Sequence, residues 1–243
     1  MPAMALFKVP WPHYGPALLT ALAKTAEFTA VGFAAAIVVG MIVAVARLTP
    51  FWPLSRLAQL YTETFKNLPL ITEIYILYFG LAAVGLKMSA FQAGSLSLAL
   101  FYGAYLSEIF RGGLQSVPRG QGEAAHALGL SPVKAFLYVR LPQAVRMALP
   151  GTSTMMVDLL KGTSLMVAIG GGELMTEGTL IASDTFQAME VYVVIGLIYL
   201  AMCYPLSQLA LLMERRLQAG TPLSLRRRRT RRAIMLRQQA VNP

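Results

Sequence analysis

The sequence predicts an all-α membrane protein with about five transmembrane helices, and two observations lead to this fold class. Hydrophobic residues make up 56% of the 243 residues and charged residues only 13%, and the mean hydropathy is +0.57, which is typical of membrane proteins. Five segments also reach the length of about 20 residues that crosses a hydrocarbon layer about 30 Å thick. Because lipid offers the backbone no hydrogen-bonding partner, these segments are expected to be helices.

The five expected spans are residues 28–46, 68–86, 88–107, 147–172 and 191–213. Three of them carry no charge, whereas the second contains Glu73 and the fourth contains Asp158 and Lys161. Residues 1–16, in which four prolines surround Trp11 and Tyr14, predict an irregular external segment at the membrane interface. The first apolar run is too long for a signal-peptide core, so we expect it to be an uncleaved span.

The distribution of Lys and Arg predicts an external N-terminus and a cytoplasmic C-terminus. In this orientation 17 of the 21 basic residues are cytoplasmic: three follow the first span, five follow the third, and nine lie from Arg215 onward. The loop between the fourth and fifth spans is then external and acidic, with Glu173, Glu177, Asp184 and Glu190.

The net charge of +10 is concentrated in the C-terminal tail, residues 218–243. A run of arginines at 226–229 would indicate nucleic-acid binding in a soluble protein. Because the tail directly follows a span, we expect it to bind anionic membrane lipid, at about 1 kcal/mol per basic residue, and no nucleic acid. A specific binding role for the run is the alternative.

No catalytic or metal-binding pattern is present. The single cysteine, Cys203, has no partner for an intrachain disulfide, and His13 and His126 have no neighbouring ligand cluster. Walker A, Gly-x-Ser-x-Gly and His-Glu-x-x-His sequences are also missing. We therefore expect no catalytic residue, no metal and no cofactor on this chain, so uphill transport would need a partner or an ion gradient.

Residues 120–142, between the third and fourth spans, predict two short cytoplasmic helices. Helix formers run from Glu123 to Leu128, and Gly129 suits the left-handed residue that ends a helix. Ser131 then offers an N-cap for a second helix, which we expect to stop before Pro142.

This segment resembles the Glu-Ala-Ala loop of ABC-importer permeases. The matching positions are Glu123, Ala124, Ala125, Gly129, Val139, Leu141 and Pro142, with Val139 where the family more often has isoleucine. An ordinary amphipathic surface loop is the alternative.

Further motifs resemble the polar amino acid subfamily, the importers of histidine, glutamine, glutamate and arginine. They lie at residues 64–70, 77–81, 104–121, 141–144, 160–165 and 184–186, and the resemblance covers about residues 17–217, the expected permease domain. The chain departs from the subfamily at Lys66, Asn67 and Leu68, which replace Arg-Gly-Thr, and at Gly162, where Asp or Asn is common.

The resemblance implies the membrane subunit of a type I ABC importer in the bacterial cytoplasmic (inner) membrane. Its partners would be two ATPase subunits, which bind ATP and Mg²⁺, a second permease that is identical or homologous, and an external amino-acid-binding protein. Contact with the ATPases is implied for residues of the 120–142 segment, hereafter the coupling loop: Glu123, Ala124, Ala125, Leu128, Gly129, Leu141 and Pro142.

Charged residues in the spans or next to them suggest ion pairs or a substrate path. Glu108 and Arg111, three residues apart, predict an ion pair on one helix face. Asp158 and Lys161 have the same spacing, and either pair with each other or line a substrate path together with Thr163 and Ser164. Glu73 is expected to face either a partner subunit or the path.

Two other classes of function compete with an ABC permease. An ion-gradient-driven secondary amino acid carrier would account for Glu73, Asp158 and Lys161, but not for the coupling loop. A non-transporting membrane scaffold subunit would use the loop without a pathway.

Overall fold

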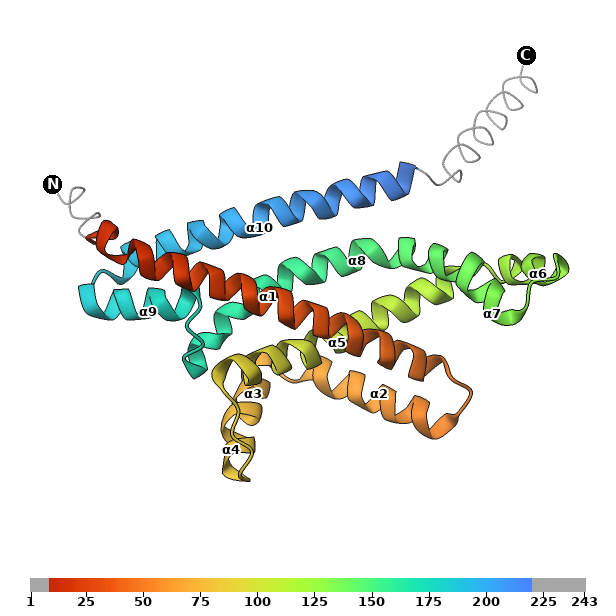
Figure 1. Ribbon diagram of the computed structural model, residues 1–243, viewed down its shortest axis with the longest axis horizontal. Coiled ribbons are helices and arrows are strands. Elements are labelled where there is room, and N and C mark those ends of the chain that lie inside the picture. Colours follow the sequence, from red (N-terminus) through yellow and green to blue (C-terminus); the bar gives the residue numbers. More distant parts are fainter. Residues whose placement is uncertain (1–8, 220–243) are drawn as a thin grey trace, which may run out of the picture.

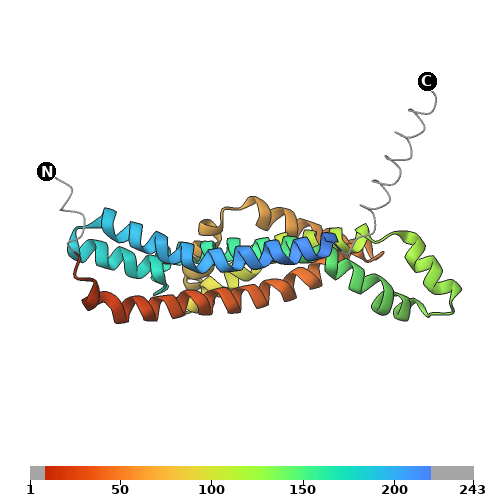
Figure 2. The ribbon, with the colours of Figure 1, turned by 90° about the horizontal axis from the view of Figure 1, so that it is seen from above.

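The computed structural model describes residues 9–219, with side chains as far as Arg216, and every regular element in this range is helical. The helices form an elongated bundle (Figures 1 and 2). The five longest helices are α1 (Trp11–Leu48), α2 (Trp52–Asn67), α5 (Ala90–Ser116), α8 (Leu141–Gly162) and α10 (Ala188–Ala219). Helices α1, α5 and α10 run in one direction, and α2 and α8 run in the opposite direction (Figure 1).

Short helices connect them. They are α3 (Leu70–Tyr75), the π-helix η2 (Ile76–Gly80), α4 (Leu81–Ala83), α6 (Arg119–Ala127), α7 (Pro132–Ala135), the π-helix η3 (Phe136–Arg140), the 3₁₀-helix η4 (Thr163–Ile169) and α9 (Leu174–Thr185). The all-helical fold class is thus confirmed for the described part of the chain.

Two helices, Trp11–Leu48 and Ala188–Arg216, are long and apolar enough to cross a membrane. The helices Pro132–Ile169 and Leu174–Thr185, bent by 49° relative to each other, qualify together as a third span. The number of five spans and their orientation remain predictions.

Helices α1 and α5 cross closely because small residues line their contact. Gly32, Ala36, Gly40 and Ala44 recur every four residues on α1 and form one face, and all four are buried. A Cβ atom added at Gly40 would lie 2.8 Å from the Leu106 Cβ atom of α5. Small residues at this spacing allow two helices to approach in a membrane, where the hydrophobic effect does not drive helices together.

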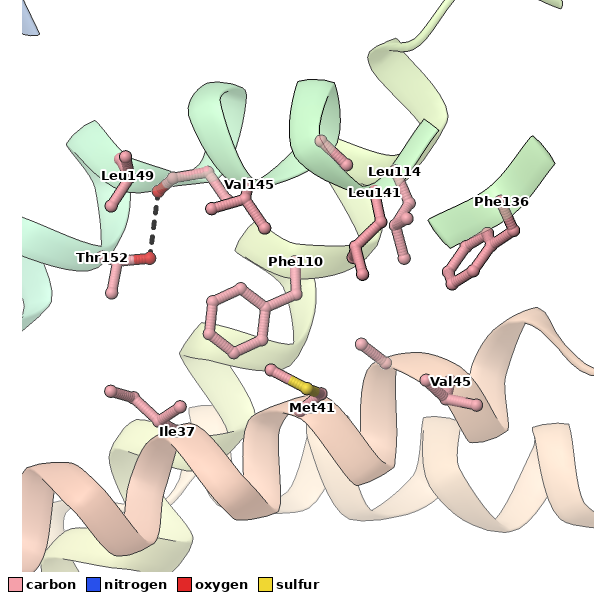
Figure 3. Close-up of a pocket in the computed structure, with 13 residues that line it drawn as sticks. Ile37, Met41, Val45, Phe110, Leu114, Phe136, Leu141, Val145, Leu149 and Thr152 are labelled. Carbon is pink, nitrogen blue, oxygen red and sulfur yellow. Dashed lines mark hydrogen bonds between the residues drawn. The ribbon is translucent and has the colours of Figure 1, made fainter. Parts of the chain in front are cut away.

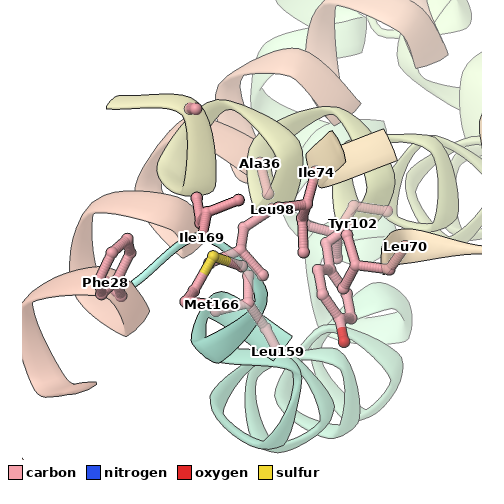
Figure 4. Close-up of a cluster of buried hydrophobic side chains, with 11 residues drawn as sticks. Phe28, Ala36, Leu70, Ile74, Leu98, Tyr102, Leu159, Met166 and Ile169 are labelled. Carbon is pink, nitrogen blue, oxygen red and sulfur yellow. The ribbon is translucent and has the colours of Figure 1, made fainter. Parts of the chain in front are cut away.

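The main core lies where α1, α3, α5, α8 and η4 meet. Figure 4 shows Phe28, Leu98, Tyr102 and Met166 among its side chains, contributed by three of these elements. Phe28, Leu98 and Met166 are fully buried, and Tyr102 is nearly so. This core fixes α5 and α8 against each other and so positions the coupling loop that joins them.

In the N-terminal half, the structure differs from two of the expected segments. Residues 11–16 are helical and not irregular, because α1 begins at Trp11 and accepts Pro12 in its first turn. The expected span 68–86 is not one long helix: Pro69 begins a separate helical segment, Leu70–Ala83, which turns aside from α2 (Figure 1).

The expected acidic external loop is largely the helix α9. Glu173 is fully buried at its N-terminus, where the carboxylate accepts hydrogen bonds from the backbone N–H groups of Met175 (2.6 Å) and Thr176 (2.9 Å). The Tyr199 hydroxyl of α10 also donates to it, at 2.8 Å. This carboxylate therefore stabilises the bundle, and the segment that we expected to be a loop is mostly helical. The arginine run at 226–229 lies outside the described residues.

Candidate functional site: the coupling loop and the charged face of α8

The coupling loop projects from one end of the molecule, at the opposite end from α9 (Figures 1 and 2). Helices α6 and α7 lie side by side in it, and the loop connects the end of α5 with the beginning of α8. It is therefore placed to contact another protein without disturbing the core.

The predicted end of the first helix is confirmed. Gly129 has a φ of +77°, in the left-handed region that favours glycine. Its N–H donates to the carbonyl of His126 (2.9 Å), and the N–H of Leu130 donates to that of Ala125 (3.1 Å). These bonds satisfy carbonyl groups that the end of α6 would otherwise leave unpaired.

The second helix begins as predicted but does not end where we expected. The Ser131 hydroxyl accepts a hydrogen bond from the backbone N–H of Lys134, which makes it the N-cap. Pro142, however, does not stop the helix: η3 continues into α8 without a break. The N–H of Leu141 bonds to the carbonyl of Phe136, five residues earlier, and Pro142 falls in the first turn of α8. The π-helical turn thus accommodates a proline that an uninterrupted α-helix would not.

The adjacent residues Ala124 and Ala125 of the loop face different ways. Ala124 is exposed beside the exposed Glu123, whereas Ala125 is 3% exposed and packs inside the loop. Leu128 is 83% exposed at the end of α6. Ala124 is therefore accessible to a partner, whereas Ala125 leaves room for α6 to approach α7 and η3.

A side-chain contact ties the loop to α8. The Gln143 amide donates to the carbonyl of Val139 (2.9 Å) and lies 3.3 Å from the Gln121 amide oxygen of α6. Leu141 points into an apolar groove of about 310 Å³ between α1 and α8, with Phe110 of α5 between the two helices (Figure 3). Leu141 thus belongs to the packing at the base of the loop and not to its tip.

The residues expected along a substrate path do not form one cluster. Asp158 and Lys161 are exposed on α8, but the Asp158 carboxylate accepts a hydrogen bond from Tyr102 (3.2 Å) and forms no ion pair with Lys161. The mutual pair, one of the two alternatives from the sequence, is therefore absent among the described residues, and Lys161 is exposed.

The two hydroxyl residues that follow are bonded to the helix itself. Thr163 is fully buried and donates to the carbonyl of Leu160 (2.7 Å), and Ser164 donates to that of Lys161 (2.7 Å). Only Ser164 of the two is partly exposed. Thr163 thus lies in the core, away from the exposed face that Asp158 and Lys161 share.

Glu73 lies inside this chain and not on a face that a partner could cover. Its side chain is 3% exposed on α3, and neither carboxylate oxygen has a hydrogen-bond partner among the described residues. Buried carboxylates in membrane proteins are rare, which singles out this residue.

The predicted Glu108–Arg111 ion pair is confirmed, and a third residue joins it. The Arg111 guanidinium lies 2.6 Å from a Glu108 oxygen, and Arg47 at the end of α1 pairs with the other oxygen. Burial alone would raise the pKa of Glu108, but the hydrogen bonds from Arg47 and Arg111 hold it below its ordinary value. Sequence spacing could not reveal Arg47, which is 61 residues away.

Tyr102 is a neighbour of the candidate path residue Asp158 that sequence reasoning missed. A Cβ atom added at Gly162 would lie 2.7 Å from the Tyr102 hydroxyl, so the ring fills the room opposite this glycine. The departure of Gly162 from the subfamily pattern was the one signal in the sequence that pointed here.

Comparison with known proteins places the chain in a family. Residues 36–219 match the family model described as "Binding-protein-dependent transport system inner membrane component". The chain is 36% identical to the probable glutamine ABC transporter permease GlnM of Bacillus subtilis over 77% of this chain and 87% of that one. It is 35% identical to the octopine transport system permease OccM of Rhizobium meliloti, over 92% of each chain.

Two solved structures of ABC transporters also match the chain. An amino acid ABC transporter crystallised with histidines matches with a TM-score of 0.79 and 32% identity, over 84% of this chain and 95% of that one. The MetNI methionine ABC transporter matches with a TM-score of 0.70 at 20% identity, over 86% and 98% of the two chains, which shows a shared fold. The chain therefore belongs to the binding-protein-dependent transport system inner membrane component family and is a permease of the ABC transporter type.

Proposed function

We propose that the chain is the membrane subunit of an ATP-driven, binding-protein-dependent importer of polar amino acids in the bacterial cytoplasmic membrane. The family description and the relatives named for glutamine and octopine transport support this function. Two ATPase subunits would bind ATP and Mg²⁺, a second permease would complete the pathway, and an external binding protein would deliver the amino acid.

One structural observation carries the coupling role. The helical path from Pro132 runs through η3 into α8 and continues as far as Ile169. A displacement of the coupling loop by closing ATPases would therefore move α8 with it as a rigid body. Glu123, Ala124 and Leu128 form the exposed part that contacts the ATPase, and a carboxylate at Glu123 can accept charge-assisted hydrogen bonds there. Gly129, Leu141 and Pro142 set the bend and the base of the loop.

The pathway would run along the exposed face of α8. A zwitterionic amino acid needs groups of both charges, which Asp158 and Lys161 offer one helical turn apart. Ser164 lies three residues beyond Lys161, whereas the buried Thr163 supports the packing of η4. Glu73 would belong to the substrate pathway from its buried position on α3.

The experiment is to purify the transporter with its ATPases and to measure substrate-stimulated ATP hydrolysis for Glu123→Lys. We expect loss of stimulation with an unchanged melting temperature, because Glu123 is exposed. Glu63→Lys, which reverses an exposed carboxylate on α2, is the matched control and should retain stimulation.

Normal stimulation in Glu123→Lys would refute the coupling role. Uptake that needs an ion gradient and no ATP would instead support a secondary carrier. The absence of uptake by the complete complex would support a scaffold subunit.

A further inference from the structure

The junction between α9 and α10 holds an aromatic side chain in an unusual position. Phe186 is the one non-glycine residue among the described residues with a positive φ, +54°, and its side chain is 89% exposed. A left-handed conformation costs a bulky residue roughly 1–2 kcal/mol, and an exposed phenyl ring gains nothing from burial. The left-handed residue ends α9, a position that glycine or asparagine would fill at lower cost, so a phenylalanine there points to a contact with another molecule.

The backbone on both sides of Phe186 is fixed. The Thr185 hydroxyl donates to the carbonyl of Ile181 (2.7 Å) and accepts from the N–H of Gln187 (3.3 Å). The Tyr14 hydroxyl of α1 donates to the Asp184 carboxylate, one residue before Thr185.

A second contact joins the N-terminal end of α1 to the start of α10. The Trp11 indole donates to the Glu190 carboxylate at the start of α10, at 2.9 Å, and Glu190 is 5% exposed. The backbone that carries the Phe186 ring is thus held on both sides, which lowers the entropy lost on binding.

The accessible charge close to Phe186 in sequence is negative. Of the four carboxylates in residues 170–190, Glu173 and Glu190 are buried, whereas Asp184 is exposed and Glu177 partly exposed, and this segment contains no Lys or Arg. Met189, 73% exposed, adds a second apolar side chain close by in sequence. The junction lies at the opposite end of the molecule from the coupling loop (Figures 1 and 2).

We propose that Phe186 is the anchor on which the external binding protein docks, seated in an apolar pocket rimmed by basic side chains. This inference rests on the proposed function, which supplies the partner. A rigid, exposed aromatic residue is typical of an interface hot spot, and an acidic surround favours a basic partner surface. A bilayer fits less well, because anionic headgroups are repelled by the accessible carboxylates of Asp184 and Glu177, and a phenyl ring lacks the polar group that Trp and Tyr place at the interface.

The test uses the whole transporter in lipid nanodiscs, with the binding protein that copurifies from its host, loaded with its amino acid. The measurement is the concentration of binding protein that gives half-maximal stimulation of ATP hydrolysis. Phe186→Asn removes the ring, and asparagine tolerates the left-handed conformation, so the fold is kept. We expect at least a tenfold higher half-maximal concentration with an unchanged basal rate. Phe186→Gly, which also relieves the strain, should behave in the same way and replaces the Asn variant if that variant does not fold.

Phe51→Asn is the matched control, because Phe51 is also an exposed aromatic residue, 63% exposed, but lies between α1 and α2. It should leave the half-maximal concentration unchanged. A wild-type complex that no binding protein stimulates would overturn the proposed function itself. Stimulation of the wild type with the same half-maximal concentration in both Phe186 variants would overturn only the docking role. A changed basal rate that depends on lipid composition, with the same half-maximal concentration, would overturn it in favour of a lipid contact.

Discussion

The hydroxyl of Tyr102 on α5 lies 3.2 Å from a carboxylate oxygen of Asp158 on α8 and donates a hydrogen bond to it. This bond joins the two helices that lead into and out of the coupling loop. It also takes Asp158 away from Lys161, the partner that sequence spacing suggested. The cation at Lys161 is therefore free of an ion pair within the described part of the chain.

Lys161→Ala should weaken transport without harming the fold. Because the Lys161 side chain is exposed and forms no ion pair with the residues that the structure describes, its removal leaves the packing of α8 intact, and only the carboxylate of the substrate would lose a partner. We expect a rise in KM of roughly tenfold, equivalent to about 1.4 kcal/mol, in uptake assays with reconstituted transporter. Lys87→Ala, at an exposed lysine before α5, is the control. Unchanged kinetics for every amino acid would place the site elsewhere.

Gly40→Ala should destabilise the protein. The added Cβ atom would lie 2.8 Å from the Leu106 Cβ atom and 3.1 Å from the Gly103 carbonyl oxygen, so α1 and α5 would have to separate. Overpacking of this kind costs typically about 1–3 kcal/mol, and we expect a lower melting temperature in detergent. Gly112→Ala is the matched control, since no atom lies within 4 Å of its Cβ position. It should be neutral or slightly stabilising because alanine favours helix, and equal effects of the two changes would contradict the close crossing.

Gly129→Ala should loosen the coupling loop. Its φ of +77° costs an alanine roughly 1–2 kcal/mol, so the end of α6 should unwind part of the time. Faster amide hydrogen exchange over residues 120–142 and weaker substrate-stimulated ATP hydrolysis would show this. Gly120→Ala, also in the loop, has open space at its Cβ position and no positive φ, and should change neither measurement.

The Arg47–Glu108–Arg111 cluster should make the stability of the fold depend on pH. The folded pKa of Glu108 lies below its ordinary value, so the carboxylate stabilises the fold fully above that value, about 4.3 for glutamate. Its contribution is lost as the pH falls further through the lower folded pKa. Melting temperatures measured from pH 6 to pH 3 should therefore fall more steeply for wild type than for Glu108→Gln. Parallel curves would show that the cluster contributes little.

Removal of residues 218–243 should leave uptake largely intact. We expect these arginines to bind anionic lipid and to take no part in the pathway. Uptake by vesicles that contain the truncated chain tests this, and complete loss of transport would contradict it.

Local patterns in the sequence were sufficient for features that depend on neighbouring residues. Hydrophobic runs predicted the all-helical fold, Gly129 predicted the end of α6, and Ser131 predicted the start of α7. The spacing of Glu108 and Arg111 predicted their pair. Each of these follows from backbone preference or helix periodicity, which act over a few residues.

Tertiary structure decided what depends on residues far apart in the chain. Pro142 remains within a helix because a π-helical turn ends just before it, and the role of Ala125 follows from the packing of α6 against η3. Asp158 binds Tyr102, 56 residues away, in place of its neighbour Lys161. Sequence spacing shows which side chains can meet on one helix, but the crossing of two helices determines which partner is actually within reach, because a hydrogen bond forms only over about 3 Å.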